Sequence, residues 1–282
     1  MIERLKLTIL VEDSSRSENK GLQAEHGLSV LIEIPEQKCS LLMDTGRSPN
    51  TLLHNMKILR TDLNKINIVV LSHGHYDHTG GLVGLLKQLN KPIPVVAHPE
   101  IFKPKFKIDP YLKYIGLPCK ASEIETWSGK LVLARNPVKI MNDVSTTGEI
   151  KRITSYEKVL GFWTVENEKF VKDLMRDDQA LVLKIKSKGL AVISGCAHSG
   201  IVNTVNQAKR LMKTEKVYAI LGGFHLIGAS KERINSTIED LDKINPDFLY
   251  PCHCTGSKAI KEMTKTFGKR CKPLKTGDTL EL

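Results

Sequence analysis

The segment Ser72-His73-Gly74-His75-Tyr76-Asp77-His78-Thr79-Gly80-Gly81 decides the fold of this 282-residue chain. It follows an apolar run of the kind that forms a buried strand. Side chains two residues apart in an extended segment project to the same side, so His73 and His75 can bind one ion. Asp77 and His78 lie beyond the bend and can serve a second ion. The spacing therefore predicts a metal-binding loop between a strand and a helix.

The rest of the chain alternates short runs rich in Ile, Val and Leu with amphipathic segments. We expect strands at residues 5–11, 28–34, 40–43, 66–71, 93–97, 130–134, 138–141, 180–185, 190–194, 217–221 and 247–251. We expect helices at residues 50–59, 81–89, 201–211, 232–243 and 257–266. Each half opens with strands and then adds helices, which suggests an α/β fold built as a four-layer αβ/βα sandwich. Periodicity alone does not separate this layout from other α/β folds.

We expect one domain over residues 1–282, with an insertion at about residues 99–126. The insertion has no clear period and mixes prolines with lysines, among them Lys105. It forms either a lid over the site or a surface connection whose lysines are solvated. A second irregular region covers residues 146–171.

The composition narrows the class of protein. Hydrophobic residues make up 41% and no apolar stretch approaches the ~20 residues of a membrane span. The net charge of +11 favours a small anionic or phosphorylated substrate. Nucleic acid is the less favoured partner, because aromatic content is only 5% and the basic residues are spread out. Six sparse cysteines and an N-terminus without a leader pattern predict a cytoplasmic protein with reduced thiols.

The His-x-His-x-Asp-His motif at a strand, loop and helix junction resembles the signature of the metallo-β-lactamase superfamily. The resemblance implies a dinuclear metal enzyme, in which two divalent ions hold a shared hydroxide and polarise an acyl or phosphoryl oxygen. Histidine-rich ligation suits zinc, while iron or manganese would also fit. The implied ligands are His73, His75 and His198 for one ion and Asp77, His78 and His253 for the other. Asp77 and His225 are the residues we place in catalysis, with His225 as either ligand or acid/base.

Two positions support or modify this ligand set. Asp44 resembles the family's early aspartate, which hydrogen-bonds the ligand loop and orients a histidine; the alternative is an Asx turn before Gly46. Cys196 stands where the family usually has an aspartate after a glycine. It supports the ligands, binds as a thiolate, or is a packing residue. No histidine lies between His98 and His198, so the family's third ligand of the first ion is missing unless His198 supplies it from a shifted position, as we expect.

Further phrases resemble one subfamily, which includes an archaeal synthase of methanopterin biosynthesis. They are Glu25-His26-Gly27-Leu28-Ser29, Met43-Asp44-Thr45-Gly46, Thr147-Gly148-Glu149-Ile150, residues 195–200, Gly223-Phe224-His225-Leu226 and Cys252-His253-Cys254-Thr255-Gly256. The resemblance implies a transferase that joins a dihydropterin methyl group to an arylamine and expels diphosphate. Glu149 would then bind pterin N–H groups, or else form a turn with Arg152.

Two other functions stay open. One is a dinuclear hydrolase of a phosphodiester, lactone or thioester, and the other is a non-catalytic or redox module of the same fold. The absence of a flavin-binding loop disfavours the redox module. We expect Cys252 and Cys254 to point away from His253, as core residues or as residues that support the ligands rather than as zinc ligands. We leave His26 and His54 without a role.

Overall fold

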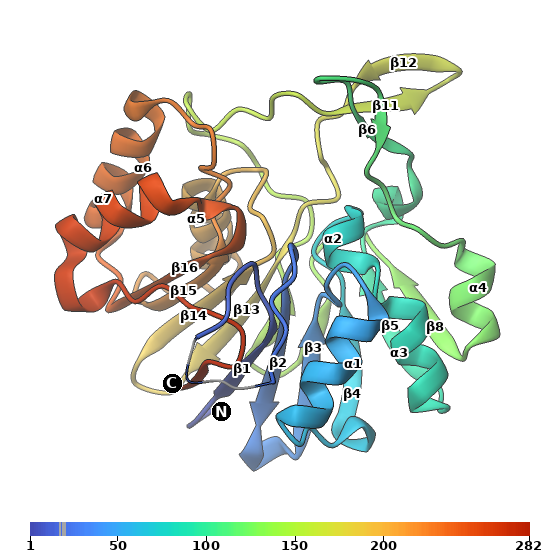
Figure 1. Cartoon of the computed structure of the whole chain (residues 1–282). Coiled ribbons are helices and arrows are strands. Elements are labelled where there is room, and N and C mark those ends of the chain that lie inside the picture. The colour runs from blue at the N-terminus through green and yellow to red at the C-terminus, as the bar shows by residue number, and fades with distance from the viewer. Residues whose placement is uncertain (17, 19–20) are drawn as a thin grey trace. The chain divides into compact units, whose positions relative to one another are not determined.

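The computed structural model (Figure 1) describes residues 1–16, 18 and 21–282. The chain divides into two compact units. Unit 1 consists of Met1–Glu3, Asn136–Lys158 and Asp178–Leu274. Unit 2 consists of Arg4–Arg135, Val159–Asp177 and Lys275–Leu282, and it carries the histidine loop at residues 72–81. Our expectation of one domain over residues 1–282 stays a prediction.

Unit 2 contains, in its described residues, a seven-stranded sheet in the order β17-β1-β2-β3-β4-β5-β8. The strands are β1 (Lys6–Val11), β2 (Ser29–Ile34), β3 (Cys39–Met43), β4 (Ile66–Val70), β5 (Ile93–Ala97), β8 (Gly129–Leu133) and β17 (Thr279–Glu281). Strands β3, β4, β5 and β8 run parallel to their neighbours in this order, so their carboxyl ends meet at one edge of the sheet. The histidine loop leaves the sheet at this edge, directly after β4.

The described helices of unit 2 are α1 (Pro49–Ile58), α2 (Tyr76–Thr79), α3 (Leu82–Leu89) and α4 (Ala121–Thr126). Helices α1, α3 and α4 bury apolar side chains in the core of this sheet, whereas the short α2 buries Asp77, His78 and Thr79. The hydroxyl of Ser48 accepts a hydrogen bond from the Thr51 backbone N–H at 3.3 Å and caps α1, with Pro49 at the first helical position. Buried leucines of α3 at helical spacing join the core of the sheet. Helix α3 ends at Asn90 in a left-handed conformation.

A small sheet of unit 2 occupies the two segments that the sequence left irregular. Its strand order is β12-β11-β6-β7, with β6 (Lys105–Lys107), β7 (Lys113–Tyr114), β11 (Trp163–Glu166) and β12 (Lys169–Lys172). Strands of two to four residues are too short to show a period, which is why sequence analysis missed them. The role of residues 99–126 as a lid stays a prediction.

Unit 1 contains, within the described chain, a six-stranded sheet in the order β16-β15-β14-β13-β10-β9. Its strands are β9 (Lys139–Met141), β10 (Val144–Thr146), β13 (Ala180–Ile185), β14 (Gly189–Ser194), β15 (Val217–Gly223) and β16 (Phe248–Cys252). Helices α5 (Ile201–Met212), α6 (Lys231–Ile244) and α7 (Ser257–Phe267) lie together beside this sheet (Figure 1). Strands β14, β15 and β16 are parallel, so the loops after them begin at the same edge.

The secondary structure follows the periodicity of the sequence closely. Every strand and helix that we expected is present, with ends that shift by no more than two residues. Short 3₁₀ turns complete the described elements at Pro35–Gln37, Leu63–Lys65, Pro99–Phe102, His253–Thr255 and Gly268–Arg270. Among the described residues, no helix combines the length and apolar character needed to cross a membrane.

Candidate metal centre

Asp44 orients the histidine loop of unit 2. This aspartate follows β3 and is completely buried. Its Oδ1 accepts a hydrogen bond from the Ser72 backbone N–H at 2.7 Å, and its Oδ2 accepts one from the Ser72 hydroxyl at 2.6 Å. His78 Nδ1 lies 2.6 Å from the same Oδ2 and is the donor, because a carboxylate can only accept. The bond leaves Nε2 of His78, 3.8 Å from Asp77 Oδ2, as the nitrogen that could bind an ion.

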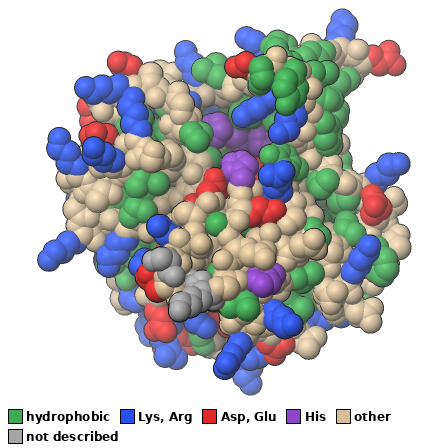
Figure 2. Space-filling model, in the orientation of Figure 1, with side chains coloured by type: hydrophobic (Ala, Val, Ile, Leu, Met, Phe, Trp, Pro, Cys, Tyr) green, Lys and Arg blue, Asp and Glu red, His purple; other side chains and the backbone are tan. Residues whose placement is uncertain are grey.

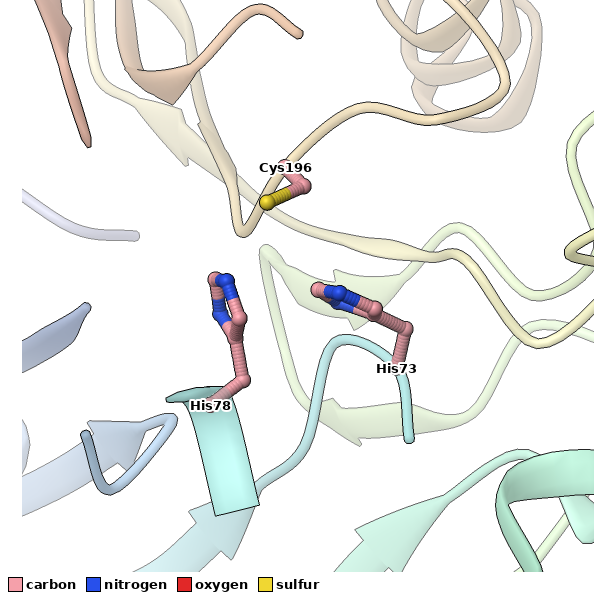
Figure 3. A group of neighbouring side chains, drawn as sticks. All are labelled: His73, His78 and Cys196. Atoms are coloured by element: carbon pink, nitrogen blue, oxygen red, sulfur yellow. The ribbon is translucent and has the colours of Figure 1, made fainter. Parts of the chain in front are cut away.

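His73 and His75 are spaced to share an ion. His73 Nδ1 lies 2.8 Å from the Ser72 hydroxyl, and its Nε2 lies 3.1 Å from His75 Nδ1. Two nitrogens that each bind a tetrahedral zinc at ~2.0 Å are about 3.3 Å apart, so the observed spacing fits. The His73 and His78 rings, with centroids 4.3 Å apart, are shown in Figure 3. Burial, together with His78 and His75, holds the pKa of His73 well below its usual value, so the ring is neutral, as ligation requires.

A buried ion-pair network supports the histidine loop. The Gly74 N–H donates to Asp177 Oδ2 at 2.8 Å, and Lys105 Nζ lies 2.8 Å from Asp177 Oδ1 and 3.0 Å from Asp173 Oδ2. Burial acts to lower the pKa of Lys105, but the charges and hydrogen bonds of Asp177 and Asp173 outweigh it and raise the pKa. A Cβ at position 74 would lie 2.5 Å from the Ile101 carbonyl oxygen, so only glycine fits. Lys105 is 1% exposed, and the interpretation of it as a solvated lysine is wrong.

Three cations lie over aromatic rings beside the histidine loop. Lys107 Nζ is 5.3 Å from the ring centroid of Phe162. Arg47 Cζ and Lys113 Nζ are 5.5 Å and 5.8 Å from the ring centroid of Tyr76. Elsewhere Lys and Arg side chains are spread over the visible face (Figure 2). The three cations form a local positive field that an anionic ligand would meet.

Unit 1 presents its candidate ligands at the ends of three parallel strands. Cys196, which Figure 3 shows, and His198 follow β14, His225 follows β15, and His253 follows β16. The His198 and His225 ring centroids are 4.2 Å apart. His225 and His253 have φ values of 45° and 49°, and Ala197 has 52°. Left-handed backbone at non-glycine residues clusters at functional sites, where the fold enforces it.

Asp178 fixes the loop that carries His198. Its Oδ2 accepts a hydrogen bond from the Ser199 backbone N–H at 2.8 Å. Burial raises its pKa to about 6, against the opposing effect of the hydrogen bonds from Ser199. Asp177 and Asp178 are consecutive, so each candidate ligand loop is tied through a backbone N–H to one of two neighbouring carboxylates. Sequence analysis missed both aspartates; a pair of acidic residues directly before a buried strand was the available signal.

The buried Asp178 carboxyl gives a prediction about pH. Because its pKa rises from 3.8 unfolded to about 6 folded, its charge costs stability above about pH 6, and this cost disappears as pH falls through 4. We expect Asp178→Asn, which resembles the protonated form, to raise the free energy of unfolding at pH 8 by up to about 3 kcal/mol.

Urea unfolding of the metal-free chain at pH 4 and pH 8 measures this effect, with Asp242→Asn on the exposed side of α6 as control. The expected gain at pH 8 vanishes at pH 4. An equal effect of Asp178→Asn at both pH values would contradict the assignment.

The structure brings His26, to which we gave no role, to the histidine loop. Its Nε2 lies 3.3 Å from Asp77 Oδ2 and its Nδ1 lies 2.9 Å from Asp13 Oδ2. The position of the Glu-His-Gly phrase just before β2, a neighbour of β3, was the signal in the sequence for His26.

The side chain of Glu149 is exposed. The Arg152 guanidinium donates a hydrogen bond to the Ser199 hydroxyl at 3.2 Å.

Comparisons with known proteins agree on one family and one fold. Residues 22–212 match the metallo-β-lactamase superfamily. The chain is 38% identical over 288 residues to the 7,8-dihydropterin-6-methyl-4-(β-D-ribofuranosyl)-aminobenzene-5′-phosphate synthase of Methanocaldococcus jannaschii, covering 99% of this chain and 97% of that protein. An uncharacterized protein of the same organism is 33% identical, covering 92% and 94%. The crystal structure of Tm1679, a metal-dependent hydrolase of the β-lactamase superfamily, matches with a TM-score of 0.84, 30% identity and 99% coverage of both chains.

Proposed function

Because the chain belongs to the metallo-β-lactamase superfamily and has its fold, as the sequence analysis predicted, we propose that it is a metal-dependent enzyme with a dinuclear centre. The proposed ligands are His73, His75 and His198 for one ion and Asp77, His78 and His253 for the other. Two divalent ions in such a centre polarise an oxygen and stabilise a departing oxyanion. Zinc suits these nitrogen and carboxylate donors best, and iron or manganese is the alternative.

One observation carries the proposal of a metal site: Asp44 holds His78 by its Nδ1 while His73 and His75 nitrogens lie 3.1 Å apart. This is the arrangement that prepares neutral imidazoles for an ion.

We propose that the reaction is the transfer of a dihydropterin methyl group to an arylamine. The basis is the 38% identity to the Methanocaldococcus synthase over nearly the whole chain. The bond between the dihydropterin methyl carbon and the diphosphate oxygen breaks, and a bond from that carbon to the amine nitrogen forms. The amine proton passes to a side chain of the site, for which Asp77 and His225 are the candidates. The bonding electrons of the broken bond leave with the diphosphate.

An assay of diphosphate release tests this reaction. Release only in the presence of the arylamine is the expected result, because nitrogen rather than water attacks the carbon. Release that is independent of the arylamine would contradict the transferase. The metal centre is tested separately by elemental mass spectrometry, where His198→Ala should lose about one metal equivalent per chain relative to the wild type.

A hydrolase is the second candidate function, favoured by the similarity to Tm1679. Its substrate would be a phosphodiester, lactone or thioester, with water as the nucleophile. Turnover of a generic phosphodiester without any amine would support this function over the transferase. Both functions need the same ligands, so the metal analysis does not distinguish them.

We propose that the cations over the aromatic rings receive the phosphorylated substrate. Phe162, which carries Lys107 on its face, has its ring centroid 5.1 Å from that of His75. We expect Lys107→Gln with Lys113→Gln to raise KM about a hundredfold or more with little change in kcat, since each charge-assisted hydrogen bond to phosphate contributes about 1.5–3 kcal/mol.

Steady-state kinetics checks this, with Lys130→Gln on the exposed face of β8 as the control. The double variant should also lose most of its inhibition by free diphosphate. An unchanged KM together with unchanged diphosphate inhibition would exclude these lysines from the binding site.

Glu149 is the proposed partner of the pterin N–H groups, because a carboxylate accepts paired donors and its side chain is exposed. We expect Glu149→Gln to raise the dissociation constant of a dihydropterin roughly tenfold, since the amide cannot accept both bonds. Calorimetric titration measures it. Unchanged affinity in Glu149→Gln would remove this residue from the site.

A further inference from the structure

Unit 1 contains a compact cluster of two thiols and an imidazole that the proposed centre does not use as a set. The sulfur atoms of Cys196 and Cys254 and a ring nitrogen of His225 all lie within 4.8 Å of one another. The cysteines are 3% and 6% exposed. Cys254, expected from the sequence to be a core or ligand-supporting residue, is buried, and its sulfur lies 3.5 Å from the carbonyl oxygen of Cys196.

The backbone around the cluster is shaped to hold these three side chains. A Cβ at Gly223 would lie 2.5 Å from Cys254 Sγ, so glycine at this position makes room for the sulfur. The Leu226 and Ile227 N–H groups both donate to the Cys254 carbonyl oxygen at 3.1 Å. These bonds fix the loop after β15, with His225, against the loop after β16, with Cys254. Such preorganisation is expected of a binding site rather than of cysteines that only fill space.

We propose that Cys196, Cys254 and His225 bind a thiophilic divalent cation such as zinc or iron(II). Thiolate sulfur is a soft donor and selects these ions over magnesium or calcium. Three ligands from two cysteines and a histidine match a tetrahedral site with one open position. Each thiol that binds the cation releases its proton to solvent. The uptake of one cation therefore releases up to two protons. His225 then serves as a ligand, which leaves Asp77 as the acceptor of the amine proton.

This inference uses residues of unit 1 alone and does not depend on the histidine loop. It changes the role of Cys196 from a residue that supports ligands to a ligand itself. It also assigns Cys254, which has no counterpart among the ligands implied by the family resemblance. The proposed function and this site can therefore succeed or fail separately.

Divalent cobalt is the probe, because thiolate coordination gives a sulfur-to-cobalt charge-transfer band in the near ultraviolet that histidine and carboxylate ligands do not give. We expect the metal-free full chain to develop this band on titration with cobalt. Cys254→Ser and Cys196→Ser should each reduce it by about half or more, while Cys271→Ser, another buried cysteine of unit 1, should leave it unchanged.

Two further variants keep the test decisive if a serine variant folds poorly. Cys254→His keeps a donor atom at the position and should bind cobalt with a weakened charge-transfer band. His75→Ala should lose activity and keep the band, which separates this site from the proposed function. No band in the wild type, or a full band in folded Cys254→His, would overturn the proposal.

Discussion

Replacing His75 with alanine is expected to abolish turnover and to remove metal from the protein. His75 Nδ1 lies 3.1 Å from His73 Nε2, so the substitution removes one of the two nitrogens that the loop offers to the first ion. A transition state that loses the stabilisation of a fixed positive charge slows by roughly 10²–10³-fold or more. We expect activity below detection and a loss of about one metal equivalent, both measured on the same preparation.

The control for His75→Ala is His54→Ala, which removes an imidazole from α1 instead of from the loop. His54 contacts the Gly21 carbonyl oxygen at 2.6 Å, so its loss should change neither the metal content nor kcat. Full activity of His75→Ala with unchanged metal content would contradict the whole ligand assignment, including the pairing of His73 with His75.

The long strands and helices were predictable from sequence because each is a continuous run with a clear period. Helix α3, for example, places Leu82, Leu85, Leu86 and Leu89 on one buried side, and that spacing is visible in the letters alone. The two short helices and the small sheet were not predictable. Helix α2 has four residues and β7 has two, so neither completes a period that a pattern could reveal.

The candidate site shows the same division between local and distant signals. The histidine motif lies within one loop, so its candidate ligands and their spacing are visible in the amino-acid sequence alone. The residues that hold the loop in place lie far away along the chain: Asp177 is 103 residues from Gly74 and 72 residues from Lys105. No spacing rule connects such residues, and only the fold shows that a lysine in a basic segment is an internal ion-pair partner.

Lys105→Met is expected to destabilise unit 2 strongly, because it leaves the carboxylates of Asp173 and Asp177 buried without their cation. Breaking a buried ion pair from one side costs about 3–5 kcal/mol. For a chain of this size each kcal/mol lowers Tm by roughly 2–4 °C, so a fall of about 10 °C is expected. Lys103→Met is the matched control in the same segment. Its side chain is about a third exposed and pairs with Glu100 and Glu166, so its loss should cost no more than about 1 kcal/mol.

The same variant tests whether the network positions the metal loop or only stabilises the fold. Asp177 accepts hydrogen bonds from both Lys105 and the Gly74 N–H, so movement of Asp177 would displace the backbone between His73 and His75. We expect metal affinity of the folded Lys105→Met protein to fall roughly 10–100-fold, as it does when partners of metal ligands are removed. Adding Asp173→Asn removes one uncompensated charge and should restore stability in part, while metal affinity recovers only if Asp177 returns to its position. Affinity equal to the wild type in Lys105→Met would show that Asp177 holds Gly74 without help from the lysine, and would limit the role of Lys105 to stability.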